Sequence, residues 1–433
     1  MMDKLKKIFH FFIPQIADIV YGYPGKKMVV IGVTGTKGKS TTCKLISSVL
    51  EAGGNKVGLM STVEFKIGDH AVPNDKKMSM LGRGQIQKML REMVKAGCRY
   101  AVIETSSEGI LQYRHLGVHY DIVVFTNLGT EHSERHGGFE NLKRDKGKIF
   151  ADMNKEKHKR IDGKKVDRVI VANTDDKNAD YYLGFNADKK IAYCLNNDIQ
   201  YSIFHILKGS IIKSGSQGSQ FDIGDKKYEI RIQGEFNVYN ALAAVAVGES
   251  RGIPEDKIAK GLASVTLVPG RMEFIDEGQD FKVIVDYAHE PLSYAGLFSS
   301  CKEMMKGTGG RLIAVIGSDG GGRDKGKRRK MGEIAGKMAD YVVVTDVNCH
   351  DEDPLEIAEM LAKGSREAGK KDGDNLFVEI DRRQGIEKAI SLARANDIIV
   401  ITAKGTEPCI VVADGKRIPW DDRKVAREVL RRK

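Results

Sequence analysis

The segment from residue 32 to residue 42 constrains the fold of this chain more than any other. It reads Gly-Val-Thr-Gly-Thr-Lys-Gly-Lys-Ser-Thr-Thr. The apolar run 28–31 before it is typical of a buried strand, and residues 43–50 after it have a helical pattern. A glycine-rich loop between a strand and a helix brings backbone N–H groups and the positive end of the helix close to phosphate oxygens. The sequence therefore predicts a phosphate-binding loop (P-loop) in an α/β fold.

The side chains of this P-loop have the chemistry needed to bind a nucleoside triphosphate. Lys39 is expected to contact the β- and γ-phosphates, and Ser40 to bind Mg²⁺. Val33 stands where the general Walker pattern has a glycine, so the spacing is Gly-x-Thr-Gly-Thr-x-Gly-Lys-Ser. The alternative is a tight turn that binds no nucleotide. The predicted nucleotide contacts in the loop are Gly35, Thr36, Gly38, Lys39, Ser40 and Thr41.

Strand-like and helix-like segments alternate through most of the chain, with strand-like runs at 100–103 and 122–125. The alternation predicts a mainly parallel sheet covered on both faces, with ligands outside the carboxyl ends of the strands. Residues 151–233 are more polar. The elements expected there are one strand at 168–172 and short strand-and-turn pieces around 209–210 and 215–216.

A second α/β alternation follows the linker-like stretch 267–271. Its expected strands are 283–285, 312–316, 341–344 and 398–401. We therefore predict three parts. They are a short N-terminal segment (1–26), a central P-loop domain with a mainly parallel sheet (27–268) and a C-terminal Rossmann-like α/β domain (269–433).

Composition narrows the possible partners. The chain has 70 Lys and Arg against 59 Asp and Glu, a net charge of +11, but the basic residues are scattered. We therefore expect no nucleic-acid binding and interpret the excess as general surface charge or as suited to an anionic substrate. The six cysteines form no CxxC pair, and no apolar run approaches the ~20 residues of a transmembrane helix. We expect a cytoplasmic, monomeric protein with reduced thiols.

The N-terminal segment 4–14 combines basic residues with an apolar cluster. It has no small-residue cleavage site, and Pro14 interrupts the apolar run. We interpret it as a short helix packed on the body of the protein. The alternative is a weak contact with a membrane surface.

Polar residues follow the strands of the first alternation. Glu104 ends one strand, where a carboxylate can bind Mg²⁺ directly or through water. The segment 126–137 follows the next strand and crowds His132 and a second histidine together with two acids. A helical stretch follows, with three lysines at 143, 146 and 148.

In the second alternation, Asp286 and His289 follow the first strand, and the glycine-rich, cationic segment 317–328 follows the second. Such a loop is suited to anions. The alternative is a solvated basic surface loop.

Taken in order, these segments resemble the Mur ligases, ATP-dependent enzymes that add amino acids to the growing peptide of the cell-wall precursor, peptidoglycan. The matching segments are 32–42, 104–107, 126–128 with His132, 234–240, 270–273, 286–289, 322–328 and 404–407. Gly-Arg-Met-Glu at 270–273 and Arg-Asp-Lys-Gly-Lys-Arg at 323–328 are most similar to the third-residue ligases of the MurE type. Folylpolyglutamate synthetases share the core but generally lack the second of these segments.

The resemblance implies that a substrate carboxylate attacks the γ-phosphate of ATP and that an amine then displaces phosphate from the acyl phosphate. Cations must neutralise the two anions that meet in the first step. The implied magnesium ligands are Ser40, Glu104 and His132, with Lys146 as a further ligand if CO₂ carbamylates it. The implied catalytic residues are Lys39, His132, Lys146 and Arg271.

The resemblance also implies binding residues in both alternations. Asn237 and Asn240 would contact the adenine side, and Arg271 and Asp286 the phosphate and ribose. The implied contacts to the amino acid and acceptor are Ser106, Ser107, His289, Arg323, Asn348 and Glu407.

Two features depart from the MurE pattern. Full-length MurE-type enzymes carry a UDP-sugar-binding domain before the P-loop, whereas residues 1–31 precede it here, so we expect UDP recognition not to follow the usual mode. Ligases that add diaminopimelate have Asp-Asn-Pro-Arg where this chain has Val-Asn-Cys-His at 347–350. Histidine cannot grip a carboxylate with two parallel hydrogen bonds as arginine does, which leaves the added amino acid open. The remaining alternatives are a ligase for a non-muramyl carboxylate and a nucleotide-binding protein without catalysis.

Overall fold

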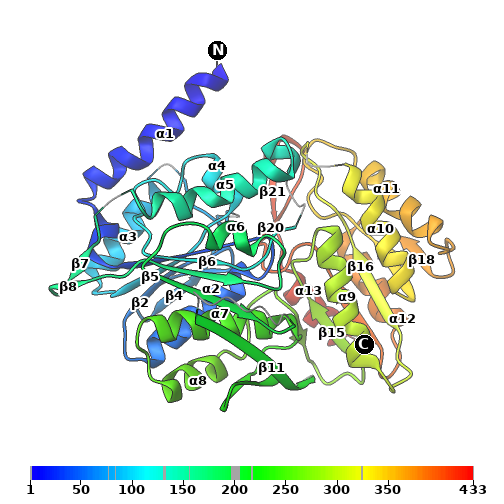
Figure 1. Ribbon diagram of the computed structural model, residues 1–433. Coiled ribbons are helices and arrows are strands. Elements are labelled where there is room, and N and C mark those ends of the chain that lie inside the picture. The colour runs from blue at the N-terminus through cyan, green and yellow to red at the C-terminus, as the bar shows by residue number, and fades with distance from the viewer. Residues whose placement is uncertain are drawn as a thin grey trace. The chain divides into compact units, whose positions relative to one another are not determined.

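The computed structural model describes residues 2–76, 78–82, 84–129, 133–155, 157–196, 205–215, 218–322 and 325–432. The chain forms two compact units, Met1–Thr266 (unit 1) and Leu267–Lys433 (unit 2), which Figure 1 colours from blue to green and from green to red.

Unit 1 is built on one sheet of eleven strands in its described part, in the order β13-β12-β11-β10-β9-β6-β1-β5-β2-β3-β4. The central strand β1 (Val29–Thr34) pairs in parallel with β5 (Tyr100–Glu104) and β6 (Ile122–Phe125). The parallel part continues through β2 (Val57–Met60), β9 (Val169–Asn173), β10 (Lys189–Cys194) and β11 (His205–Gly215). The antiparallel strands are β3 (Glu64–Ile67), β4 (His70–Pro73), β12 (Gly218–Ile223) and β13 (Lys226–Ile230). The runs predicted at 28–31, 100–103, 122–125 and 168–172 are all strands of this sheet.

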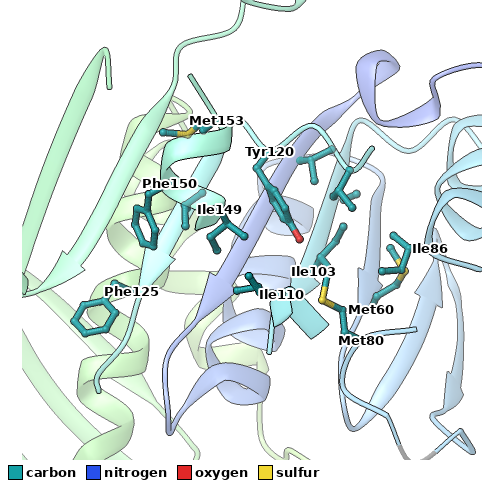
Figure 2. Close-up of a cluster of buried hydrophobic side chains, with 14 of the residues drawn as sticks. Met60, Met80, Ile86, Ile103, Ile110, Tyr120, Phe125, Ile149, Phe150 and Met153 are labelled. Atoms are coloured by element: carbon teal, nitrogen blue, oxygen red, sulfur yellow. The ribbon is translucent and has the colours of Figure 1, made fainter. Parts of the chain in front are cut away.

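Helices cover both faces of this sheet, as expected. On one face, α2 (Lys39–Ala52) packs against α7 (Phe236–Ser250) and α8 (Glu255–Ser264). The other face is covered by α3 (Gln85–Lys95), α4 (Ser107–Leu111), α5 (Phe139–Asp152) and α6 (Ala179–Leu183). Figure 2 shows the apolar cluster under these helices, with Ile86, Ile110 and Phe150 facing strand residues such as Ile103 and Phe125.

The turn predicted around 209–210 is wrong, because Gly209 and Ser210 lie inside the long strand β11. Most side chains of β11 are exposed, and a strand with one solvated face carries the polar residues that suggested a loop. A side chain at Gly209 would collide with Leu195 and Leu242, so the glycine permits close packing. Gly215 ends the strand, and Ser216 lies outside the described residues.

Unit 2 has a six-stranded sheet within its described residues, in the order β14-β15-β19-β16-β17-β18, parallel except for the β14–β15 pair. Its strands are β14 (Glu273–Ile275), β15 (Lys282–Val285), β16 (Leu312–Ile316), β17 (Tyr341–Val344), β18 (Leu376–Val378) and β19 (Ile398–Ile401). One face packs on α9 (Pro291–Met305), α10 (Gly326–Met338) and α11 (Pro354–Glu367), and the other on α12 (Arg382–Leu392) and α13 (Asp422–Leu430). A short pair, β20 (Cys409–Val411) and β21 (Arg417–Pro419), follows the sheet. All four strands predicted in this half are present.

The N-terminal helix α1 (Met2–Val20) continues through Pro14, so the proline that interrupts the apolar run of the sequence does not end the helix. Proline has no N–H to donate to the His10 carbonyl. The Gln15 side chain donates a hydrogen bond to the Phe11 carbonyl at 2.9 Å in the next turn of the helix. Among the described residues, none of the helices has the length and apolarity needed to cross a bilayer.

Candidate active site

The P-loop lies between β1 and α2, and two of its backbone positions can be occupied only by glycine. Gly38 has φ +80°, in the left-handed region, and a Cβ there would collide with Oδ1 of Asn240. A Cβ at Gly35 would likewise collide with Oγ1 of Thr126. Both positions therefore require glycine, which keeps the loop backbone close to its neighbours.

The segment after β6 holds the P-loop in place. The Asn127 carbonyl accepts a hydrogen bond from the Thr36 N–H at 2.9 Å, and its Oδ1 accepts one from the Lys37 N–H at 2.8 Å. The Gly129 N–H donates to Oγ1 of Thr36 at 2.8 Å. Asn127 was not among the predicted site residues, although its position two residues after the end of β6 was a signal.

Lys39, Ser40 and Glu104 meet beside the loop. The Lys39 Nζ donates to the Thr36 carbonyl at 2.9 Å, and the Ser40 hydroxyl donates to Oε2 of Glu104 at 2.9 Å. The same carboxylate oxygen accepts the Thr62 N–H at 2.7 Å. A hydroxyl and a carboxylate are the hard oxygen ligands that Mg²⁺ prefers, so these two residues fit the predicted metal. Within the described ranges, no group of three or more His, Cys, Asp or Glu side chains is arranged so that it could hold a metal ion.

The structure distinguishes the three lysines of α5. Lys146 is buried, and its Nζ donates to the Gly35 carbonyl at 2.9 Å. Lys143 lies over the ring of Tyr181, and Lys148 pairs with Asp145. Of these three lysines, Lys146 is the one whose hydrogen bond joins it to the P-loop backbone, and it is the lysine that the family resemblance implied.

Two predicted asparagines connect α7 to the P-loop helix. Oδ1 of Asn240 accepts the Thr42 hydroxyl at 3.0 Å, and its Nδ2 donates to Oδ1 of Asn237 at 2.7 Å. Both asparagines are buried. Of the two predicted serines, Ser106 caps α4 by accepting the Gly109 N–H, and Ser107 is the first residue of that helix.

A polar cluster forms in unit 2 where three parallel strands end. Nδ2 of Asn348 donates to Oδ1 of Asp319 at 2.7 Å and to Oε2 of Glu407 at 3.0 Å. The Lys404 Nζ donates to the same Glu407 oxygen at 3.0 Å and to Oδ1 of Asn348 at 3.2 Å. Lys404 is fully buried, and it was not among the predicted site residues. These residues follow β16, β17 and β19, at the carboxyl edge where α/β sheets bind ligands.

Arg271, Asp286 and His289 lie near one another in unit 2. The Arg271 guanidinium lies over the Tyr287 ring, 4.5 Å from its centre. The Asp286 carboxylate accepts the N–H groups of Met272 at 2.8 Å and Ala288 at 2.6 Å. Nδ1 of His289 lies 2.7 Å from the Tyr287 carbonyl. The predicted site residues His132 and Arg323 lie outside the described residues.

The glycine-rich segment before α10 is fastened by Glu352. This carboxylate accepts hydrogen bonds from Arg328 at 3.0 Å and from the Gly322 N–H at 3.1 Å. The hydrogen bond from Arg328 is the main cause that lowers the pKa of Glu352 to about 2. Arg328 is itself buried and is paired with Glu352, so its positive charge holds the segment in place and does not face a ligand in solution.

Two family models match the chain: the Mur ligase middle domain over residues 33–248, and the Mur ligase, glutamate ligase domain over residues 270–405. A UDP-N-acetylmuramyl-tripeptide synthetase from Roseiflexus sp. is 37% identical over 423 residues, which cover 96% of this chain and 81% of that protein. The chain belongs to the Mur ligase family. A 2,6-diaminopimelate-adding relative from Caldanaerobacter subterraneus is 35% identical over 96% of this chain and 81% of its own length.

Solved structures agree with this assignment. A UDP-N-acetylmuramoyl-L-alanyl-D-glutamate–2,6-diaminopimelate ligase matches with a TM-score of 0.60 and 28% identity, covering 94% of this Mur ligase and 78% of that chain. A folylpolyglutamate synthase from Mycobacterium tuberculosis has a TM-score of 0.65 at 16% identity, covering 91% of this chain and 92% of that one, and shares the fold alone.

The predicted enzyme class is confirmed, because Mur ligases are ATP-dependent, ADP-forming amide ligases. Mur ligases form peptide bonds in peptidoglycan precursors and use ATP with Mg²⁺. The similarity of this chain to tripeptide synthetases supports the Mur ligase assignment better than the folylpolyglutamate synthetase alternative.

Proposed function

We propose that this Mur ligase joins an amino acid to the terminal carboxylate of a UDP-N-acetylmuramoyl-peptide-like acceptor. The similarity to tripeptide synthetases over 96% of the chain carries the proposal. The grouping of Lys39, Ser40 and Glu104 in unit 1 supports it, since these groups suit phosphoryl transfer. Cytoplasmic location and a monomeric state stay predictions from the sequence.

The side chains of unit 1 have distinct roles in the proposed reaction. Lys39 neutralises charge on the γ-phosphate as the acceptor carboxylate attacks it. Ser40 and Glu104 would hold Mg²⁺, which when bound adds positive charge at the transferring phosphoryl group. The Gly38 backbone and the helix start after it bind the phosphates of ATP. The acyl phosphate formed in this step is the species that the amine of the amino acid attacks, with loss of phosphate.

The amino acid would bind at the polar cluster of unit 2. Its ammonium group would donate to the carboxylates of Asp319 and Glu407, which Asn348 and Lys404 hold in place. His350, at the position of the arginine in diaminopimelate ligases, lacks the fork that grips a distal carboxylate. We therefore propose that the enzyme prefers an amino acid without such a carboxylate.

A substrate panel tests this function directly. The purified enzyme would receive ATP, Mg²⁺, a UDP-N-acetylmuramoyl-dipeptide and one of several amino acids, including lysine, ornithine, alanine and diaminopimelate. We expect phosphate release only when both the acceptor and an amino acid are present, with diaminopimelate a poorer substrate than the best neutral or monocarboxylate amino acid. Turnover of glutamate with a folate acceptor, but with no muramyl peptide, would contradict the proposal.

We also propose that Lys146 is carbamylated and serves as an anionic ligand beside the P-loop. Its burial and its hydrogen bond to the Gly35 carbonyl support this role, because a carbamate there would lie close to the phosphates. The Lys146→Arg variant cannot form the carbamate and should lose about 10²–10³-fold in kcat. Lys143→Arg and Lys148→Arg are matched controls on the same helix and should stay within a few-fold of the wild type.

Carbon-13 NMR separates carbamylation from a merely structural role of Lys146. Enzyme equilibrated with ¹³C-bicarbonate should show one carbamate signal that Lys146→Arg lacks and Lys143→Arg keeps. A wild-type spectrum without that signal, or a signal that persists in Lys146→Arg, would refute carbamylation of this residue.

A further inference from the structure

Helix α1 presents an apolar face that the rest of unit 1 leaves largely exposed, apart from an edge contact between the Phe11 and Tyr113 rings at 5.4 Å between their centres. Figure 1 shows it leading away from the other elements of unit 1, with the N-terminus at its far end. Seven of the fifteen large hydrophobic side chains that are exposed in the described part of the chain belong to this helix. They are Ile8, Phe9, Phe11, Phe12, Ile16, Ile19 and Val20, each 40–71% exposed.

The opposite side of α1 is already used for packing. Pro14, Ala17 and Asp18 are buried, and the helix contacts α3. The Asp18 carboxylate lies 2.7 Å from Nε2 of His119. This pair joins the C-terminal end of α1 to the loop that precedes β6. Because this side is occupied, the exposed side of the helix is left for a partner outside unit 1.

The sequence of α1 indicates the chemistry of that partner. Lys4, Lys6 and Lys7 precede the exposed apolar residues, and no acidic residue occurs from 4 to 17. A helix that joins basic residues to phenylalanine and isoleucine matches a bilayer surface with anionic headgroups. A second copy would bring the same lysines and a net charge of +11, so charge opposes self-association through this face.

We propose that α1 is a membrane-binding helix that lies in the surface of an anionic bilayer. Its phenylalanines enter the boundary between headgroups and acyl chains, to a depth of roughly 5–10 Å. The lysines pair with anionic headgroups and the sheet of unit 1 stays outside. This role is independent of the ligase reaction, since no residue of the helix belongs to the proposed active site.

Vesicle co-sedimentation of the full chain tests the proposal. We expect binding to vesicles of phosphatidylcholine with a quarter phosphatidylglycerol, and about 100-fold weaker binding to phosphatidylcholine alone, since each basic residue near an anionic surface contributes about a five-fold effect. The Lys4→Gln/Lys6→Gln/Lys7→Gln variant should show the same loss, and raised salt should weaken wild-type binding.

Apolar variants complete the test. Phe9→Gln/Phe12→Gln removes side chains that are 59% and 53% exposed, and should abolish vesicle binding while leaving circular dichroism and phosphate release unchanged. The matched control is Leu292→Gln/Leu355→Gln in unit 2, at 56% and 51% exposure, which should bind vesicles like the wild type.

Three results would overturn the proposal. They are wild-type protein that does not sediment with anionic vesicles, a control variant that loses binding as much as the phenylalanine variant, and a dimer in light scattering that Phe9→Gln/Phe12→Gln dissociates while vesicles stay unbound. The last result would assign the exposed face to a second copy of the chain.

Discussion

Replacing Lys39 with alanine should lower kcat/KM for ATP by about 10²–10³-fold, the usual effect of removing one preorganised charge donor from a transition state. Lys39 begins α2, and its ammonium group lies 2.9 Å from the Thr36 carbonyl, which places it over the P-loop. Without Lys39, less positive charge is present to offset the repulsion between the attacking carboxylate and the γ-phosphate. The measurement is phosphate release at saturating acceptor and amino acid, with ATP varied.

Lys44 offers the matched control for Lys39. It lies further along the same helix and pairs with Glu64 at 2.6 Å, away from the loop. Lys44→Ala should keep kcat/KM within a few-fold of the wild type, and both variants should keep the circular dichroism of the parent. Equal losses in the two variants would mean that general helix charge, and not the P-loop position, explains the effect.

Replacing Asp422 with alanine should destabilise unit 2 by about 3–5 kcal/mol, because the change leaves a buried arginine without its counter-charge. Arg382 and Asp422 are almost fully buried, and the carboxylate accepts two hydrogen bonds from the guanidinium, both at 2.7 Å. The Trp420 ring N–H also donates to Asp422 at 2.7 Å. The same arginine donates to the Thr402 carbonyl at the end of β19, so the pair supports the edge that carries the polar cluster.

Trp420 is the single tryptophan of the chain, so its fluorescence reports the unfolding of unit 2 in urea. The neighbouring pair Arg383–Glu428 also joins α12 to α13 but is exposed. Glu428→Ala should therefore shift the urea midpoint much less than Asp422→Ala, since exposed ion pairs contribute little. Similar shifts in the two variants would show that the buried pair has no special role.

Eight strands of the two sheets could be predicted because each is a short apolar run that the sheet buries almost completely on both faces; they are β1, β5, β6, β9, β15, β16, β17 and β19. The burial of β1, β6 and β16 is complete along their length. β11 was partly missed because solvent reaches most of its side chains, and a polar strand has the composition of a loop. Pro14 interrupts the apolar run of the N-terminal segment but does not end α1, although proline cannot donate a backbone hydrogen bond there.

The candidate site was predictable to a different degree in each unit. In unit 1 the contacting residues come from contiguous motifs, whose spacing identifies them. In unit 2 the polar cluster joins residues from three separate loops: Asp319 after β16, Asn348 after β17, and Lys404 with Glu407 after β19. Lys404 and Glu407 are an i,i+3 pair in one loop, but Asp319 and Asn348 lie far from that loop in the sequence, so spacing along the chain carries no signal of the contacts of Asn348 with Asp319 and Glu407.

By itself, the sequence determined that the chain has a P-loop, two α/β halves and the ordered motifs of a Mur ligase. These properties depend on residue type and short-range spacing, which are local. Only the tertiary structure decided which distant groups meet: Ser40 with Glu104, 64 positions apart, and Thr42 with Asn240, 198 positions apart. Parallel strands bring their carboxyl ends to one edge of the sheet whatever the length of chain between them. The rotation of α5 about its axis turns Lys146, and not Lys143 or Lys148, toward the P-loop.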